Sequence, residues 1–148
     1  MTSADKPKGC VMCAAVATPE SAESLVVHVG DHCFILMNLY PYSSGHVMVT
    51  PKRHIGRLAD ATPEELQEMM GLVRRLESVL GEVYKPDGMN IGMNLGRSAG
   101  AGVADHIHLH LVPRWVGDSN FMSVVAETRV IPEDPLEACH RLRVFFER

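Results

Sequence analysis

Three histidines alternate with apolar residues in the segment His106-Ile-His108-Leu-His110-Leu-Val. Successive side chains of an extended strand point to opposite faces of a sheet, so we expect the three imidazoles to share one face. Imidazole changes its charge near neutral pH, and its neutral form acts both as a metal ligand and as a nucleophile. The spacing therefore indicates a metal site or a site of acid–base and nucleophilic chemistry, with a solvated strand face as the structural alternative.

The residues around this segment favour an anionic ligand. Metal sites of the cupin type usually add a Glu a few residues after the histidines, whereas this chain continues with Val112, Pro113 and Arg114. Residues 96–102 are rich in glycine, and the backbone N–H groups of such a loop, together with an arginine, suit phosphate oxygens. We therefore expect phosphoryl chemistry rather than a redox or Lewis-acid metal centre.

The cysteines form a second pattern with chemical meaning. Cys10 and Cys13 have the C-x2-C spacing, which in a reducing cytosol indicates a metal site or a redox pair rather than a disulfide. A single C-x2-C pair is a weak signal, and a free thiol pair in a mobile tail is the alternative. Cys33 lies in an apolar run and Cys139 in a predicted helix, and we expect both to be small buried side chains.

Length and composition indicate one globular domain over residues 1–148, with residues 1–9 as a flexible tail. The formal net charge of −4 does not suit a nucleic-acid partner. No run approaches the roughly 20 apolar residues of a membrane helix, and the polar N-terminus has no signal-peptide core. We therefore expect a cytoplasmic protein with neither membrane nor nucleic acid as a partner.

The elements that must position the histidines can be predicted from apolar runs and turn residues. Residues 24–29 and 32–38 indicate a β-hairpin, because the Gly-Asp pair between them suits a tight turn. Residues 39–45 are rich in Pro, Ser and Gly and indicate a loop, and a third strand is expected over 46–50.

The clearest helix runs from Thr62 to about Gly81. Thr62 suits the N-cap, Pro63 suits the first helical position, and Glu65 completes a capping box. Apolar residues at the i, i+3, i+4, i+7 spacing predict one buried face. These residues are Leu66, Met69, Met70, Val73, Leu76 and Leu80.

The remaining elements predict an α+β domain with an antiparallel sheet, one long helix and a C-terminal helix. Residues 89–95 and 106–112 indicate two further strands, and the two asparagines of the first share one face. A final helix is expected after Asp134. Residues 120–126 predict one more strand.

These motifs together resemble the histidine-triad (HIT) family. The family motif has three histidines that alternate with apolar residues and are followed by two more apolar residues, as in residues 106–112. The Gly-His pair at His46 resembles the family strand that supplies a fourth histidine, and Asn38 lies where the family binds a ribose. The resemblance covers about residues 10–121. Its Pro-Arg-Trp continuation is similar to bacterial relatives of the fragile-histidine-triad proteins, which include diadenosine-tetraphosphate phosphorylases.

The resemblance implies a HIT-like fold, a homodimer with one continuous sheet, and a nucleotidyl hydrolase or transferase. The implied substrates are nucleoside, chiefly adenosine, polyphosphates such as diadenosine polyphosphates. His108 corresponds to the nucleophile that forms a nucleotidyl-histidine, and we expect a backbone carbonyl to hold its second ring nitrogen. The implied catalytic residues are His46, His106, His108 and His110, and the implied nucleotide-binding residues are Asn38, Asn94, Gly100, Gly102, His108, His110 and Trp115.

One position departs from the family pattern and leaves alternatives open. Many members have Ser, Thr or Gln near Gly102, where a hydroxyl or amide contacts phosphate, whereas this chain offers only backbone donors there. Hydrolysis and phosphorolysis are therefore both open. A nucleoside phosphoramidase, a nucleotide-binding protein with negligible turnover and a zinc-organised interaction module are the alternative functions.

The resemblance also implies a structural zinc site. Zinc-binding bacterial members use a Pro-Lys-x-His element and the first histidine of the triad, which correspond to His54 and His106. Together with the knuckle of residues 10–13, the expected ligands are Cys10, Cys13, His54 and His106, a closed set that would remove His106 from acid–base chemistry. A Mg²⁺ ion is expected to accompany a polyphosphate substrate.

Overall fold

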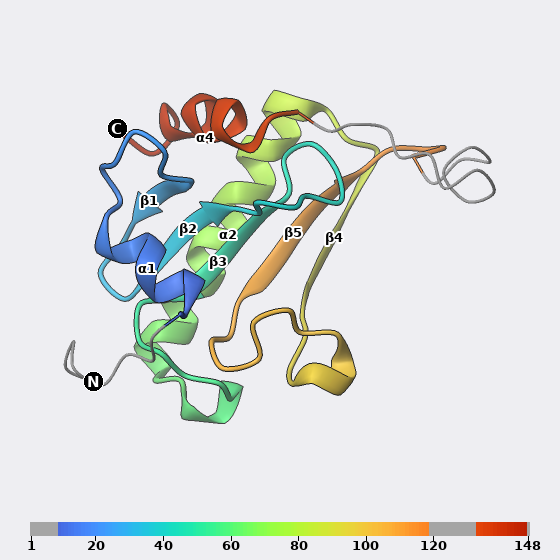
Figure 1. Ribbon diagram of the computed structural model, residues 1–148. Helices are drawn as coiled ribbons and strands as arrows, with labels where there is room; N and C mark the ends of the chain where they lie inside the picture. The colour runs from blue at the N-terminus through green and yellow to red at the C-terminus, as the bar shows by residue number, and fades with distance from the viewer. Residues whose placement is uncertain (1–8, 119–132, 148) are drawn as a thin grey trace.

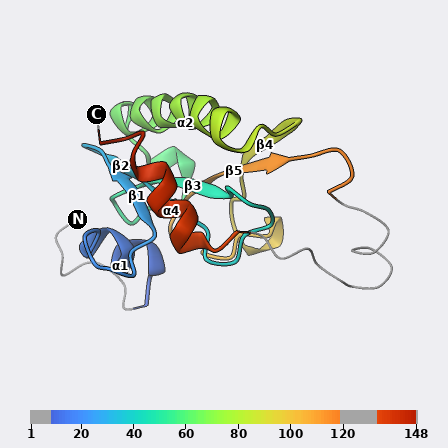
Figure 2. The same cartoon turned by 90° about the horizontal axis from the view of Figure 1, so that it is seen from above.

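The computed structural model describes residues 9–118 and 133–147. A five-stranded sheet lies between the long helix α2 and the short N-terminal helix α1 (Figures 1 and 2). The elements are α1 (Val11–Ala17), β1 (Val26–Val29), β2 (Cys33–Met37), β3 (Val47–Pro51), the 3-10 helix η2 (Leu58–Asp60), α2 (Pro63–Tyr84), β4 (Gly88–Met93), the 3-10 helix η3 (Arg97–Ala99), β5 (Leu109–Arg114) and α4 (Pro135–Arg143).

All neighbouring strands of the sheet are antiparallel, in the order β1-β2-β3-β5-β4. This confirms the predicted α+β class with an antiparallel sheet. His110 on β5 pairs with Met48 on β3 and with Gly92 on β4. The register therefore places His110, the last histidine of the triad, between β3, which begins directly after His46, and the edge strand β4.

Different elements bury the two faces of the sheet. On one face, α2 and α4 pack against fully buried side chains that include Ile35, Val47 and Leu111. On the other face, α1 covers a smaller cluster around Phe34 and Met48. The part of this second face that β5 and β4 form carries the pocket described below.

Helix α2 begins as predicted. The Thr62 hydroxyl accepts a hydrogen bond from the Glu65 backbone N–H (3.1 Å), and the Glu65 carboxylate accepts one from the Thr62 N–H (2.8 Å). The helix continues to Tyr84, beyond the predicted end at Gly81, and stops where Lys85 adopts a left-handed φ of 48°. Among the described residues, neither this helix nor another is both long and apolar enough to cross a membrane.

The buried face of α2 differs in part from the predicted one. Leu66 and Met70 are 36% and 56% exposed, so their prediction as core residues was wrong. Apolar residues lie on both sides of the buried helix face. The apolar period alone does not tell which of them contact the sheet, and the packing of α2 on the sheet decides which are buried. The buried apolar residues of the helix are Met69, Leu72, Val73, Leu76, Val79 and Leu80.

The predicted hairpin is present and is anchored to α2. The Glu68 carboxylate accepts hydrogen bonds from the backbone N–H groups of Asp31 (2.9 Å), His32 (2.6 Å) and Cys33. Three backbone donors on one carboxylate hold the turn between β1 and β2 against the helix. Burial of the Glu68 carboxyl opposes its ionisation, but these bonds outweigh that effect and lower its pKa.

Two strand boundaries and one helix differ from the sequence expectations. The triad strand β5 begins at Leu109 rather than at residue 106, because the preceding backbone bonds to the loop after β3 instead of pairing in the sheet. β4 ends at Met93, short of residue 95. Helix α1 was not predicted, and its N-cap residue Cys10 makes no side-chain cap. The predicted strand over 120–126 lies outside the described residues.

The C-terminal helix matches its prediction. The Asp134 carboxylate accepts a hydrogen bond from the Leu136 backbone N–H (2.9 Å) and caps α4. Cys139 and Leu142 of this helix are fully buried, and so is Cys33 on β2. The expectation that Cys33 and Cys139 are small buried side chains is therefore confirmed.

Candidate active site and metal cluster

Three of the four predicted catalytic histidines lie together on the face of the sheet that carries the pocket. Nε2 of His46, the residue before β3, lies 2.9 Å from Nδ1 of His110 on β5. The rings of His108 and His110 meet edge to face, with their centroids 4.8 Å apart. His106 turns instead toward the N-terminal cysteines. The triad segment therefore serves two separate groups of side chains.

The hydrogen bonds of His46 determine where its proton lies. The backbone N–H of Tyr42 donates to Nδ1 of His46 (3.1 Å), so this nitrogen is an acceptor. Nε2 then carries the proton and donates it to Nδ1 of His110. His110 must in turn carry its own proton on Nε2. The Tyr42 ring stacks on the imidazole of His46, with ring centroids 5.1 Å apart.

Burial keeps both rings of this pair neutral near neutral pH. His46 is fully buried, and the loss of solvation, with smaller contributions from His110 and His108, lowers its pKa to about 4. Loss of solvation also lowers the pKa of His110, with His108 as the second cause. A neutral His110 with its proton on Nε2 can donate a hydrogen bond to a bound group.

His108 is oriented by the backbone of its own segment. Its Nδ1 lies 2.9 Å from the carbonyl oxygen of His106, and a carbonyl can only accept, so Nδ1 carries the proton. The lone pair of the neutral ring is therefore on Nε2. This is the arrangement that a nucleophilic imidazole requires, and it agrees with the expected carbonyl acceptor.

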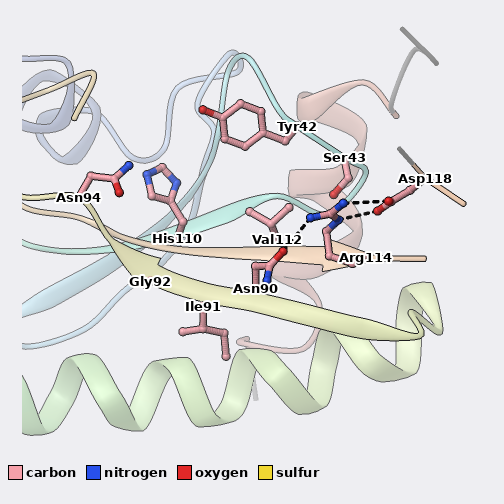
Figure 3. A pocket seen from close by; sticks show the side chains of 10 residues that line it. All are labelled: Tyr42, Ser43, Asn90, Ile91, Gly92, Asn94, His110, Val112, Arg114 and Asp118. Atoms are coloured by element: carbon pink, nitrogen blue, oxygen red, sulfur yellow. Dashed lines mark hydrogen bonds and ion pairs between the residues drawn. The ribbon is translucent and has the colours of Figure 1, made fainter. Parts of the chain in front are cut away.

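A pocket of about 480 Å³ begins at His110 and runs along β5 to Arg114 (Figure 3). Its walls come from the loop before β3 on one side and from β4 on the other. Asn94 lies beside the imidazole of His110 at one end, and Tyr42 overhangs the space (Figure 3). The lining residues are Tyr42, Ser43, Asn90, Ile91, Gly92, Asn94, His110, Val112, Arg114 and Asp118.

Arg114 at the far end of the pocket forms a hydrogen-bonded network. Its guanidinium donates to both carboxylate oxygens of Asp118 (2.6 and 2.9 Å) and to the side-chain oxygen of Asn90 (2.8 Å). The carboxylate offsets the positive charge of the guanidinium. Arg114 therefore shapes the end of the pocket and is not a lone cation poised for phosphate.

The predicted nucleotide-binding residues surround the histidines at several places. Asn38 accepts a hydrogen bond from the Tyr40 N–H (2.9 Å), and its amide nitrogen lies 3.3 Å from Nε2 of His46. Asn94 lines the pocket, and Gly100, with a φ of +93°, lies beside the Asn94 amide. Gly102 lines a second pocket next to the metal cluster, and Trp115 is absent from the described residues that line either pocket.

Sequence reasoning missed several residues of this site. Tyr42 bonds to His46 through its backbone N–H, which every residue except proline has, so no residue pattern could show this contact. Ser43 donates its hydroxyl to the Pro113 carbonyl (2.8 Å) and holds the loop to the end of β5. Asp118 stands four residues after Arg114, and that spacing was the one available signal for their ion pair.

The four predicted metal ligands converge in one cluster. Their ligand atoms, the sulfurs of Cys10 and Cys13 and a ring nitrogen each of His54 and His106, all lie within 4.8 Å of one another. Nδ1 of His106 is 3.4 Å from the sulfur of Cys10 and 3.6 Å from that of Cys13. Nδ1 of His54 is 3.5 Å from the Cys13 sulfur.

These separations fit a tetrahedral zinc site. With Zn–S bonds of about 2.3 Å and Zn–N bonds of about 2.0–2.1 Å, tetrahedral angles separate sulfur and nitrogen ligands by about 3.5–3.6 Å. The other ring nitrogen of His106 donates to the Pro51 carbonyl (2.7 Å), which leaves Nδ1 as its ligand atom. Among the described residues no second group of three such ligands occurs, so there is no dedicated carboxylate cage for Mg²⁺ in that part of the chain.

Comparisons with known proteins agree with this geometry. Residues 19–116 match the HIT domain family. The chain is 44% identical over 111 residues to AP-4-A phosphorylase of Mycobacterium tuberculosis, a match that covers 75% of this chain and 57% of the relative. It is 40% identical over 92 residues to bis(5'-adenosyl)-triphosphatase of Dictyostelium discoideum, covering 62% of this chain and 61% of that protein. The matches thus span a little over half the length of these curated relatives.

A solved structure extends the match over nearly the whole chain. The crystal structure of a Zn-bound histidine triad family protein from Mycobacterium smegmatis superposes with a TM-score of 0.73 at 31% identity, covering 94% of each chain. A fold of this kind, with histidines converging from neighbouring strands, defines a histidine-triad protein. The chain belongs to the HIT family.

Proposed function

We propose that this protein is a nucleotidyl hydrolase or transferase that cleaves adenosine polyphosphates, in particular diadenosine polyphosphates. The observation that carries the proposal is the bond from Nδ1 of His108 to the carbonyl of His106, which leaves the Nε2 lone pair available beside His110. The printed names of the M. tuberculosis and D. discoideum relatives support the substrate class.

In the proposed first step, Nε2 of His108 attacks the α-phosphorus. A P–N bond forms while the P–O bond to the rest of the polyphosphate breaks in line with it. The Nε2–H of neutral His110 donates a hydrogen bond to the leaving oxygen, which departs as the polyphosphate anion, and the leaving group occupies the pocket beside His110. The Nδ1 proton of His108 keeps its hydrogen bond to the His106 carbonyl, which stabilises the positive charge that develops on the ring.

In the second step, the acceptor replaces the leaving group beside His110. Attack by water releases a nucleoside monophosphate, and attack by inorganic phosphate releases a nucleoside diphosphate. His110 donates the same hydrogen bond to the phosphate, and the proton that an attacking water loses passes to solvent. Asn94 and the backbone N–H groups of residues 100–102 are proposed phosphate donors, with Asn38 as the ribose partner and Trp115 as a stacking surface for the base.

We assign Cys10, Cys13, His54 and His106 to a structural zinc ion. Such an ion would cross-link α1 to the loop after β3 and to the start of the triad segment. His106 then serves as a metal ligand and supplies its carbonyl to His108, while His46 orients His110 as the hydrogen-bond donor to the phosphate. A Mg²⁺ ion would enter with the polyphosphate, bound through phosphate oxygens.

We further propose a cytoplasmic homodimer in which the sheet continues from one chain to the next through β4. This strand is the sheet edge opposite β1, and all of its residues are at least partly exposed. An exposed edge presents unpaired backbone donors and acceptors to a second copy. Sedimentation velocity should give twice the chain mass of 16.3 kDa, and a monomer would contradict the proposal.

The products formed from diadenosine tetraphosphate test the reaction. Without phosphate the proposal predicts AMP and ATP, and with phosphate a phosphorylase gives ADP and ATP. The variant His108→Asn should form neither set. Nucleotide binding without products would reject the enzyme in favour of the binding protein, and cleavage of adenosine phosphoramidate alone would favour the phosphoramidase.

A further inference from the structure

The backbone that carries the proposed nucleophile lies outside the sheet ladder. β5 pairs with β3 and β4 from Leu109 onward, where Leu109 faces Val49 and Met93. Among the described strands, no ladder pair involves His106, Ile107 or His108. The hydrogen bonds that usually fix a strand residue are therefore missing at the point where the chemistry needs the most accurate position.

The loop after β3 replaces the missing ladder. The Ile107 N–H donates to the Ile55 carbonyl (2.8 Å), and Nε2 of His106 donates to the Pro51 carbonyl (2.7 Å). The Thr50 hydroxyl donates to the Ile107 carbonyl at 2.7 Å. This last bond is the one that acts on the peptide group leading directly into His108.

Thr50 differs from the other residues of its strand. β3 reads Val-Met-Val-Thr-Pro, and Thr50 is fully buried. A buried hydroxyl is costly unless it is hydrogen-bonded. The carbonyl of Pro51, at 3.5 Å, is too distant to be a good acceptor, so the bond to Ile107 is its main partner.

We propose that Thr50 is a positioning residue for the nucleophile. Its hydroxyl holds the Ile107–His108 peptide in the orientation at which Nδ1 of His108 reaches the His106 carbonyl and Nε2 faces the phosphorus. Two of the peptide groups that set the ring are thus held by the segment 50–55 and not by a strand partner. The inference rests on the proposed function, because it assumes that His108 forms the nucleotidyl intermediate.

The test compares two substitutions that differ in the hydroxyl. Thr50→Val keeps the branched shape and removes the donor, and Thr50→Ser keeps the donor. In single-turnover reactions with diadenosine tetraphosphate, Thr50→Val should form nucleotidyl-His108 about 10- to 100-fold more slowly, as expected for a misplaced reacting group, with KM unchanged. Thr50→Ser should recover most of the rate. Should Thr50→Val not fold, Thr50→Cys provides a variant of similar size with a weak donor.

Two further readouts separate positioning from general destabilisation. The imidazole nitrogen chemical shifts of His108, measured by NMR at one pH without substrate, should report a proton on Nδ1 in wild type and Thr50→Ser, and a mixture in Thr50→Val. Leu142→Ala, in the core far from the segment, should lower stability while the rate and the His108 shifts stay as in wild type.

Equal rates in wild type and Thr50→Val, or equal losses in Thr50→Val and Leu142→Ala, would overturn the inference. If wild type forms no nucleotidyl-histidine, the proposed function fails. The NMR comparison then still decides whether Thr50 orients the ring, so the two failures are distinguishable.

Discussion

The proton positions on the imidazoles decide what each ring of the site can do. Backbone groups set them at two places, the Tyr42 N–H at His46 and the His106 carbonyl at His108. As a result, His108 has an open lone pair and lies next to His110, which can donate a hydrogen bond. His110 keeps its proton on Nε2 because its Nδ1 accepts a hydrogen bond from His46. This hydrogen bond persists only while His46 remains buried and neutral.

The buried neutral state of His46 predicts a pH-dependent stability. In the unfolded chain the ring gains a proton below pH 6.5, whereas in the folded chain it does so only near pH 4. Since the unfolded state binds more protons in this window, stability falls as pH is lowered from 6.5 to 4, by about 3 kcal/mol from this group. Chemical denaturation over this range should give a shallower pH dependence for His46→Gln, and equal slopes in the two proteins would contradict the burial argument.

The sequence could predict the triad but not its supports. Alternation at a period of two identifies His106, His108 and His110 because all three are chemically distinctive. Thr50 and Tyr42 act through contacts that depend on the folded chain, a hydroxyl on a carbonyl in one case and a backbone N–H in the other. No sequence spacing corresponds to either contact, so both could be found only in the tertiary structure.

At the scale of elements, the start of α2 and the loop that carries His54 are one structural unit. The Glu65 carboxylate, almost fully buried, accepts hydrogen bonds from the Arg53 guanidinium (2.7 and 3.1 Å) and from the Thr62 N–H. The bond from Arg53 is the largest cause of the lowered pKa of Glu65. The capping box thereby also anchors the residue next to a proposed zinc ligand.

Removal of this carboxylate should be costly. Glu65→Ala loses the capping box and the Arg53 pair, and we expect a decrease of about 2 kcal/mol in the free energy of unfolding measured with urea. The neighbouring Glu64 is exposed, and Glu64→Ala should change stability by less than about 0.5 kcal/mol. Similar losses in both variants would show that the pair does not anchor the loop.

The elements that could be predicted are those whose local pattern agrees with their packing. The capping box and the apolar period identified α2, and the Asp-Pro start identified α4. Helix α1 is seven residues long and lacks a side-chain cap, so its sequence carried no capping signal. The late start of β5 follows from bonds to the segment 50–55, which no local pattern could show.

At the scale of the whole molecule, the metal cluster connects parts of the chain that are far apart in sequence. It brings α1 against the loop after β3 and against the start of the triad segment. Two of its members, Cys13 and His106, are separated by 93 positions along the chain. A zinc ion there would cross-link a face of the sheet on which α1 covers only a small apolar cluster, so metal binding should contribute to the stability of the fold.

Zinc content should depend on Cys13 and not on Cys139. Protein purified without a His tag should contain about one zinc per chain, Cys13→Ala less than about 0.2, and Cys139→Ala the wild-type amount. A chelator should lower the Tm of wild type and Cys139→Ala and leave that of Cys13→Ala unchanged. Zinc-free wild-type protein after careful handling would reject the structural zinc site.

The most direct measurement for the whole account is the site of the covalent intermediate. Wild-type protein mixed with diadenosine tetraphosphate and quenched at alkaline pH should gain the mass of one adenylyl group, and peptide mapping should place it on His108. His108→Asn should show no adduct. Turnover without an adduct under rapid quenching, or an adduct on His46 or His110, would contradict the assignment of His108 as the nucleophile.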